Sequence, residues 1–283
     1  MNAVFNLFKL RIGVAIAVAA LAGLAVQSGP ALAAWQVLAV TLAVLVSSSA
    51  AGAFNQYAER DLDARMKRTR GRPFVTGRLA HGPRWLWLIG GMIVGSFALA
   101  AWAANFAAAT YVVLGAFTYG VVYTVWLKRR TWWNIVVGGL AGSFAVLAGA
   151  ASVAPLPNPD ALALAVVLFL WTPPHFWSLA IAYRDDYAAA GVPMLPVVVG
   201  EARAARAILA SAALLVAASI VPAFYGLGWI YLIAAAAGGA FFLWKCLALV
   251  AAPGRRTALA GFFASLVQLC CVLFGAMLDV ALG

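Results

Sequence analysis

Charged residues, and acidic residues above all, are scarce in this sequence. Only 10% of its 283 residues are charged, and Asp and Glu together number eight. Because a soluble domain carries roughly 25% charged residues, this composition excludes an ordinary water-soluble protein. Apolar residues make up 66% of the chain, so we expect it to lie in a lipid bilayer.

Cysteine and histidine are also rare, which argues against several kinds of site. Cys246, Cys270 and Cys271 lie in apolar stretches and form no C-x-x-C or Cys/His pattern. We therefore interpret them as packing residues, while a redox-active Cys270–Cys271 pair stays open. His81 lies in a basic segment, where we expect an ordinary surface residue, and His175 lies in an apolar one.

Uncharged stretches of the chain are about twice the ~20 residues that one membrane crossing needs. Turn-forming or polar residues near their middles, as at 27–30, Asn105, 155–159 and 226–228, predict helical hairpins. We place these hairpins at 12–58, 85–127, 131–183 and 207–244, with a last single span at 257–278. The sequence thus predicts an all-α integral membrane fold of nine transmembrane helices in a single domain, residues 1–283.

The basic residues indicate the orientation of these helices. All 19 Lys and Arg residues lie near the N-terminus or in the segments 59–84, 128–130, 184–206 and 245–256, and the intervening turns hold none. Under the positive-inside rule this face is cytoplasmic, with the N-terminus on it. We therefore expect a multi-pass protein of a bacterial-type cytoplasmic (inner) membrane. The net charge of +11 requires no nucleic acid as a partner.

The first of two acidic motifs lies at the predicted cytoplasmic end of the second helix. Asn55, Glu59 and Asp63 are spaced i, i+4, i+8, so a helix would place them on one face. Stacked oxygen-bearing side chains suit Mg²⁺, and a solvated helix end is the alternative. Asp61 points away from this face and precedes Arg65 by four residues, which suits a surface ion pair.

The second acidic motif, 183–187, ends the predicted sixth helix on the same face and contains Asp185 and Asp186. Two facing acid clusters are typical of one or two metal ions that bridge a diphosphate. The first motif, 55–73, continues into a cytoplasmic loop to 84, and the second continues into a loop to 206. Guanidinium and ammonium groups near the motifs are candidates for binding diphosphate: Arg68, Arg72, Lys128 and Arg129.

Several motifs together resemble a known family. Asn55-x3-Glu59-x3-Asp63 with the segments 66–73, 123–131, 174–177 and 186–197 resembles the haem O synthases (protohaem IX farnesyltransferases), which are UbiA-type intramembrane prenyltransferases. The resemblance implies two four-helix bundles plus a ninth helix around a central cavity. The wider superfamily has Asp where this chain has Glu59, and Asp-x3-Asp where it has Tyr183 and Tyr187.

The resemblance also implies an activity. The donor would be farnesyl diphosphate, the acceptor haem b, the product haem O and the cofactor Mg²⁺. The implied metal ligands are Asn55, Glu59, Asp63, Asp185 and Asp186, and the implied catalytic residues are Asp63, Glu59, Tyr123 and Asp186. Aromatic rings that would shield an allylic cation are Tyr119, Tyr123, Phe176 and Trp177.

Other interpretations stay open at this point. His175 is either a ligand of haem iron or a hydrogen-bonded core histidine. An aromatic acceptor such as 4-hydroxybenzoate could replace haem b. A protein of another class, a haem transporter or oxidase assembly factor, would place ionisable residues near the middle of the bilayer. A haem A synthase or a terminal oxidase assembly would be the downstream partner.

Overall fold

The computed structural model describes residues 2–283, and its side chains from Val4 onward, as helices and connecting loops without a strand. The membrane-length elements are α2 (Leu10–Val26), α3 (Ala34–Ala58), α5 (Arg84–Ala103), α6 (Phe106–Phe117) with the π-helix η1 (Thr118–Leu127), α7 (Asn134–Gly138) with α8 (Leu140–Val153), α9 (Pro159–Ala182), α12 (Glu201–Ala218) with the 3-10 helix η2 (Val221–Phe224), α13 (Trp229–Ala251) and α14 (Arg255–Leu282). The remaining short helices are α1 (Asn2–Leu7), α4 (Arg60–Arg65), α10 (Arg184–Ala189) and α11 (Leu195–Val199).

Eight helical stretches of the described chain are long and apolar enough to cross a membrane. The ninth apolar helix, α2, is shorter, with 17 residues. The predicted all-α, multi-pass membrane character is therefore confirmed, whereas the count of nine spans is not.

Helix ends depart from the prediction where charges occur, although each predicted turn does lie between two helices. The hairpin predicted at 207–244 extends from Glu201 to Ala251, so Arg203, Arg206 and Lys245 lie within helices. Long Lys and Arg side chains carry their charge away from a backbone that stays helical. Charge-free stretches therefore underestimate the length of these helices.

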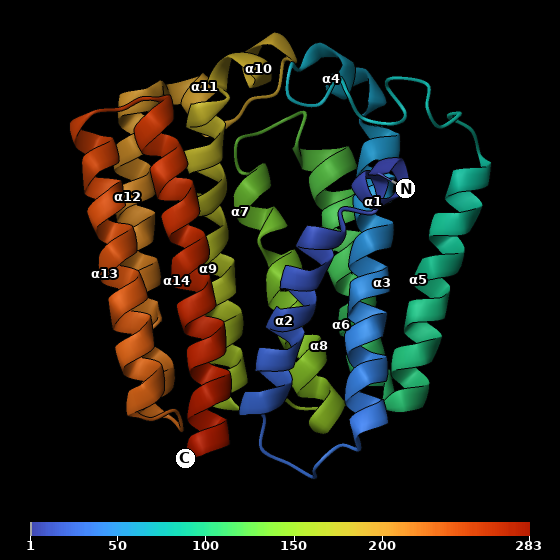
Figure 1. The fold of residues 1–283 in the computed structure, drawn as a ribbon, viewed down its shortest axis with the longest axis vertical. Coiled ribbons are helices and arrows are strands. Elements are labelled where there is room, and N and C mark those ends of the chain that lie inside the picture. Colours follow the sequence, from blue (N-terminus) through green and yellow to red (C-terminus); the bar gives the residue numbers. More distant parts are fainter. Residues whose placement is uncertain (1) are drawn as a thin grey trace.

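Two groups of helices form the body of the molecule. In the first, α2, α3, α5, α6 and α8 pack in a ring, and in the second α9, α12, α13 and α14 do the same. The contacts of α8 with α9 and of α2 with α14 join the groups (Figure 1). One group thus contains five helices and the other contains four. The expected division into two bundles of four and a separate ninth helix is not confirmed.

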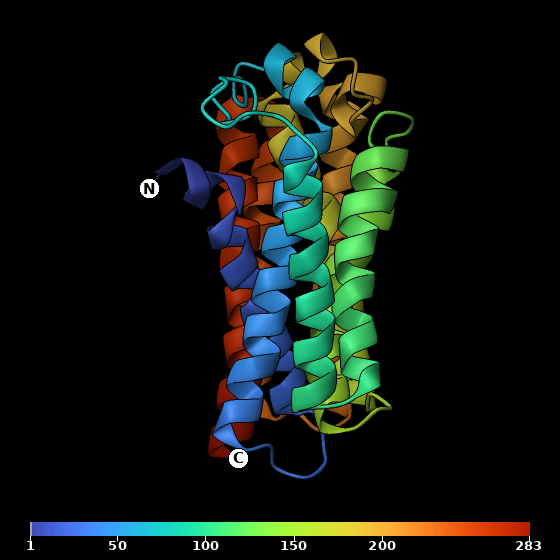
Figure 2. The ribbon, with the colours of Figure 1, turned by 90° about the vertical axis from the view of Figure 1, so that its right-hand side faces the viewer.

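The short helices α4, α10 and α11 gather at one end of the molecule (Figure 1), and the side view shows the same arrangement (Figure 2). The loops that carry Lys and Arg connect the long helices at this end. The turn between α2 and α3 and the C-terminus lie at the other end. The two acidic motifs therefore occur at the basic end of the fold, which we call the basic face.

Glycine allows the closest approach of two helices. A Cβ atom at Gly23 of α2 would overlap the carbonyl group of Val146 in α8, and one at Gly149 of α8 would overlap the carbonyl group of Ala20 in α2. Small residues that permit such backbone contact are typical of helix pairs in membranes, where the hydrophobic effect drives little association.

We predict that Gly149→Ala lowers the thermal stability of the protein in detergent, because the added methyl group forces α2 and α8 apart at a cost of about 1–3 kcal/mol. Gly95→Ala is the matched control, since Gly95 lies in α5 with nothing within 4 Å of the added carbon. The control should be as stable as the native protein or more so. Equal melting temperatures for the two variants would contradict this packing.

Candidate active site

The first acidic motif lies at the junction of α3 and α4. The helix is interrupted at Glu59, whose φ of −101° and ψ of 15° separate α3 from α4, so the predicted single helical face is not continuous. The backbone bonds from Glu59 N to Asn55 O (3.0 Å) and from Asp63 N to Glu59 O (2.8 Å) nevertheless bridge the break. Asn55, Glu59 and Asp63 are 2%, 1% and 2% exposed, which excludes a solvated helix end.

Each motif side chain is paired with a cationic group from a distant part of the chain. The ammonium groups come from the segment before α2 and from the end of η1, and the guanidinium comes from the loop after α4. Glu59 Oε1 is buried without a hydrogen-bond partner. The three pairs are Lys9 with Asn55, Lys128 with Glu59 and Arg72 with Asp63, each at 2.6 Å.

The pKa shifts reflect the cost of burying these charges. Burial is the largest cause that raises the pKa of Asp63, and Arg72 opposes it. Burial also lowers the pKa of Lys9 to about 7, and the nearby Arg72 adds to the effect. With Lys9 protonated, the cluster contains three cations and two carboxylates, so the surplus charge is positive and favours an anion, which in turn favours the protonated form of Lys9.

The π-helix brings the residues of η1 onto one side. Tyr119 and Lys128 are nine residues apart, which places them on opposite sides of an α-helix with about 3.6 residues per turn. In a π-helix, with about 4.4 residues per turn, they lie on nearly the same side. The bond from Lys128 N to Tyr123 O (2.9 Å) continues the five-residue pattern. This local geometry allows Lys128 to reach Glu59.

Two of the four predicted aromatic residues lie beside the motif. The rings of Tyr119 and Tyr123 stack at 5.5 Å, and the ammonium groups of Lys9 and Lys128 lie 5.5 and 5.7 Å from the two ring centres. Thr124 accepts a hydrogen bond from Asn55 Nδ2 (3.0 Å). The tyrosine pair and the motif therefore form one site.

The other two aromatic residues have contacts within α9 or with a loop. Phe176 packs edge-on against His175, and Trp177 lies 6.2 Å from Trp132. Their proposed role as shields of a cation stays a prediction.

The second motif has the same local geometry as the first. Tyr183, with φ −125° and ψ 31°, separates α9 from α10, as Glu59 separates α3 from α4. Tyr187 N donates to Tyr183 O (3.2 Å), as Asp63 N donates to Glu59 O. Tyr183 and Tyr187 thus occupy the positions that correspond to Glu59 and Asp63.

Arg68 connects the loop of the first motif to the second motif. Its backbone N–H donates to Asp186 Oδ2 (3.0 Å), its guanidinium donates to the Tyr187 hydroxyl (3.3 Å), and the guanidinium lies 5.2 Å from the ring centre of Tyr183. Asp185 is exposed. Asp186 is therefore the acid of the second motif that contacts Arg68.

The predicted metal ligands are only partly gathered. Residues 2–283 contain no group of three or more His, Cys, Asp or Glu side chains arranged to hold a metal ion. The five expected ligands therefore do not form one cluster. Asn55, Glu59 and Asp63 are nevertheless all buried at the junction of α3 and α4, and Glu59 Oε1, which has no hydrogen-bond partner, is an oxygen that suits a hard cation.

Asp61 pairs with Arg129, and the predicted partner Arg65 is wrong. Two hydrogen bonds of 2.8 and 2.9 Å join the Arg129 guanidinium to the Asp61 carboxylate and lower the pKa of Asp61. The two side chains are 42% and 53% exposed, which makes the pair worth about 0–1 kcal/mol. The predicted diphosphate ligand Arg129 is therefore engaged on the outer surface.

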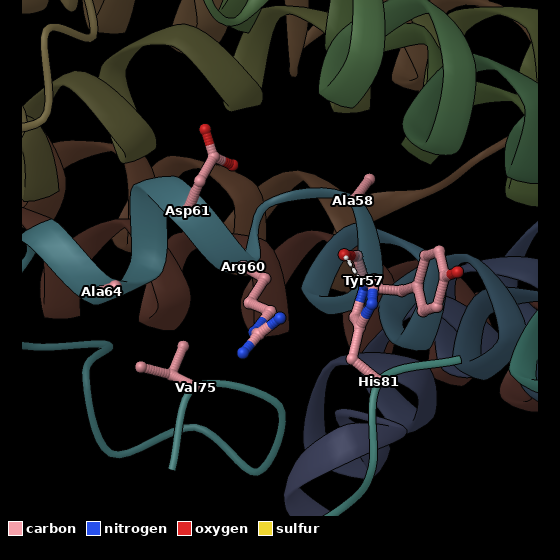
Figure 3. A pocket seen from close by; sticks show the side chains of 7 residues that line it. All are labelled: Tyr57, Ala58, Arg60, Asp61, Ala64, Val75 and His81. Atoms are coloured by element: carbon pink, nitrogen blue, oxygen red, sulfur yellow. Dashed lines mark hydrogen bonds between the residues drawn. The ribbon is translucent and has the colours of Figure 1, made fainter. Parts of the chain in front are cut away.

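A cleft of about 440 Å³ lies on this outer surface (Figure 3). The Asp61 carboxylate points away from the Arg60 guanidinium, and His81 stacks on Tyr57 with ring centres 4.0 Å apart (Figure 3). His81 is exposed, as expected, and its Nε2 lies 3.1 Å from Tyr57 O. These two contacts between His81 and Tyr57 hold the loop that follows Arg72 against the end of α3.

His175 has the surroundings of a core histidine. Its ring is stacked between Trp171 and Phe262, with centres 4.0 and 4.3 Å away, and its Nδ1 lies 2.6 Å from the Ser265 hydroxyl. The second of the two interpretations, a hydrogen-bonded packing residue, therefore fits the geometry, and a role of His175 in binding haem stays a prediction.

Sequence reasoning missed Lys9 and Thr124 as residues of the site. The sequence places Lys9 on the same predicted face as all other Lys and Arg residues of the chain, so no signal distinguished it. The position of Thr124 beside Asn55 depends on the π-helix, and the sequence of this segment gives no indication that it forms a π-helix.

The chain is similar in sequence to proteins of known family. The sequence pattern of the UbiA prenyltransferase family matches residues 16–267. Protoheme IX farnesyltransferase 2 of Paramagnetospirillum magneticum is 58% identical over 98% of this chain and 96% of its own length. Protoheme IX farnesyltransferase of Thermus thermophilus is 45% identical over 85% of this chain and 39% of its own length.

Solved structures show the same fold at low sequence identity. One described as digeranylgeranylglyceryl phosphate synthase has a TM-score of 0.79 and 16% identity, over 99% of this chain and 98% of its own. A UbiA homolog from Archaeoglobus fulgidus bound to DMAPP and Mg²⁺ has a TM-score of 0.72 and 15% identity, over 95% and 99% of the two chains.

We predict that Lys128→Met destabilises the protein by about 3–5 kcal/mol, because it leaves the Glu59 carboxylate buried without its cation. Adding Glu59→Gln should restore most of the loss in thermal unfolding. Arg129→Met is the matched control, since it breaks an exposed pair and should cost about 1 kcal/mol or less. If Lys128→Met and Arg129→Met unfold at one temperature, the buried pair is not the stabilising contact described.

Proposed function

Since the chain belongs to the UbiA prenyltransferase family, we propose that it transfers a farnesyl group from farnesyl diphosphate to a vinyl group of haem b, which forms haem O and releases diphosphate. Relatives that are 58% and 45% identical over nearly the whole chain are named protoheme IX farnesyltransferases, which supports the acceptor. The observation that carries the chemistry is the buried first motif with its three cationic partners.

The proposed metal ligands are Asn55, Glu59 and Asp63, with Asp186 as the contribution of the second motif. Mg²⁺ bound there would neutralise charge that develops on the leaving diphosphate. An amide oxygen and two carboxylates suit this ion, and a related fold that is recorded with DMAPP and Mg²⁺ supports the assignment. Asp185, which is exposed, is left out of the set.

Lys128, Arg72 and Arg68 are the proposed diphosphate-binding residues. Lys128 and Arg72 hold the motif carboxylates at 2.6 Å. An ammonium has three N–H donors and a guanidinium has five, so each can bind a carboxylate and a phosphate oxygen together. Arg129 is not retained, because its Nη1 and Nη2 both donate to Asp61 on the outer surface.

The reaction breaks the bond between farnesyl C1 and the diphosphate oxygen, and the bonding electrons leave with diphosphate. The vinyl group attacks the resulting allylic cation to form a carbon–carbon bond, and water then adds a hydroxyl group and releases a proton. Tyr123 and Tyr119 present stacked rings to cations at about 5.5 Å. A ring face stabilises a cation by roughly 0.5–2 kcal/mol, so we assign these tyrosines to the farnesyl C1 end of the donor.

The proposed topology adds α2 as a ninth span, with the basic face and the N-terminus on the cytoplasmic side of an inner membrane. Its 17 residues measure about 26 Å, close to the ~30 Å of a bilayer core. Lys9 and Arg11 at its start lie on the basic face and agree with the positive-inside rule.

No observation favours the alternative functions. The aromatic acceptor has no support among the named relatives described above. A haem transporter or assembly factor would place its ionisable groups near mid-membrane, whereas the motif acids lie at helix ends. A haem A synthase or a terminal oxidase assembly as recipient of the product stays a prediction.

We predict that the purified protein, given farnesyl diphosphate, haem b and Mg²⁺, forms a product with the mass of haem O, and that EDTA stops its formation because the carboxylate site loses its ion. Mass spectrometry of the extracted haem gives the readout, and 4-hydroxybenzoate tested in parallel should stay unmodified. Haem b that remains unchanged in a folded, Mg²⁺-containing sample would contradict the assigned acceptor.

We further predict that Asp63→Asn lowers turnover at least a hundredfold, because a buried metal ligand loses its charge. Asp61→Asn makes the same chemical change two residues away, on an exposed side chain, and should keep turnover within about threefold of the native value. Equal turnover in the two variants would remove Asp63 from the proposed ligands.

A further inference from the structure

The segment before α2 is fastened to the end of α3. Gln56 Nε2 donates to the carbonyl oxygens of Asn6 (2.6 Å) and Leu7 (3.1 Å). Leu7 is fully buried in a small apolar cluster with Ala50 and Ala53 of α3. This attachment fixes the position of Lys9, which follows two residues later.

The backbone of Lys9 adopts an uncommon conformation. With φ 48° and ψ 42° it is the one non-glycine residue among 2–283 with a positive φ. A left-handed conformation costs a non-glycine residue free energy, so the surrounding contacts must hold it in place. The turn separates α1 from α2 and lays the Lys9 side chain across Gly52, where a Cβ would come within 3.4 Å of it.

The ammonium group of Lys9 lies beside the first motif. It donates to Asn55 Oδ1 (2.6 Å) and to the Tyr119 hydroxyl (3.0 Å). Arg72 and Lys128 each form an ion pair with a carboxylate, whereas Lys9 forms none within the part of the chain that the structure describes. When Lys9 is protonated, its charge is therefore not balanced by a paired carboxylate, unlike the charges of Arg72 and Lys128.

A second cleft, of about 420 Å³, opens at this point between the Lys9 turn and the loop after α4. Its lining includes Lys9, Arg68 and Arg72 together with Asn6, Gln56 and Gly71, and within the described residues no acidic side chain contributes. A concave surface with three cations favours an anion with several oxygens.

We propose that Lys9 binds the diphosphate of the prenyl donor directly, and that its left-handed turn serves to deliver the ammonium group into this cleft. The inference rests on the proposed function and adds a third basic segment, from the N-terminus, to the residues that surround the diphosphate. The bonds to Asn55 and Tyr119 hold the ammonium group at the border of the proposed metal site and the cleft.

The test is calorimetric titration of the full-length protein in detergent with inorganic diphosphate, with and without Mg²⁺. Lys9→Gln keeps a hydrogen-bond donor for Asn55 and Tyr119 but removes the charge, and we expect it to weaken binding about ten- to a hundredfold. Lys9→Met should weaken binding at least as much, and Lys9→Arg should retain most of it. Arg11→Met, which removes one charge from an exposed residue nearby, should bind as the native protein does.

Two results would overturn the proposal. One is diphosphate binding by Lys9→Gln equal to that by Arg11→Met. The other is a loss that occurs only with Mg²⁺, which would mean that Lys9 acts through Asn55 as a positioning residue. Haem formation separates this inference from the proposed function: a native protein that makes haem O while Lys9→Gln binds diphosphate normally contradicts the role of Lys9 alone.

A measurement on the unmutated protein covers the case in which the variants do not fold. Reductive methylation followed by mass spectrometry reports the reactivity of each lysine. We expect inorganic diphosphate to protect Lys9 and to leave the exposed Lys67 unaffected. Equal methylation of Lys9 with and without diphosphate would contradict direct binding.

Discussion

The pairing of three buried motif side chains with three cations is the constraint on which the rest of the site depends. A carboxylate that is 1% exposed, such as that of Glu59, is costly to bury unless a cation neutralises it. The cations come from the N-terminal segment, the loop after α4 and the end of η1. Three separate parts of the chain must therefore converge, and this convergence forms a basic site around oxygen donors.

Two irregular backbone features make that convergence possible. The left-handed Lys9 places an ammonium group across α3, and the π-helix turns Lys128 toward Glu59. Both features cost free energy locally, and such segments are frequent at functional sites. The helix breaks at Glu59 and Tyr183 add a third feature, since they give the two motifs one common geometry with different side chains.

Much of this could be predicted from the sequence. The turns, the membrane character and the gathering of both motifs on the basic face follow from the placement of apolar and charged residues, which lipid and water separate strongly. The spacing of Asn55, Glu59 and Asp63 predicted that they act together, and their burial in the structure excludes the solvated helix end that was the alternative. The partners of Asp61 and His175 were not predicted. Tertiary packing decides which of several nearby cations or aromatic rings a side chain contacts. Lys9 and Thr124 depend on backbone conformations for which the sequence carries no pattern.

The central claim is that the first motif holds a metal ion while its cationic partners bind the diphosphate. An experimental structure with Mg²⁺ and a non-cleavable analogue of farnesyl diphosphate tests it most directly. The account predicts the metal ion among Asn55, Glu59 and Asp63, with Lys128 and Arg72 in contact with phosphate oxygens. A diphosphate bound elsewhere, with Lys128 and Arg72 still contacting only Glu59 and Asp63, would contradict it.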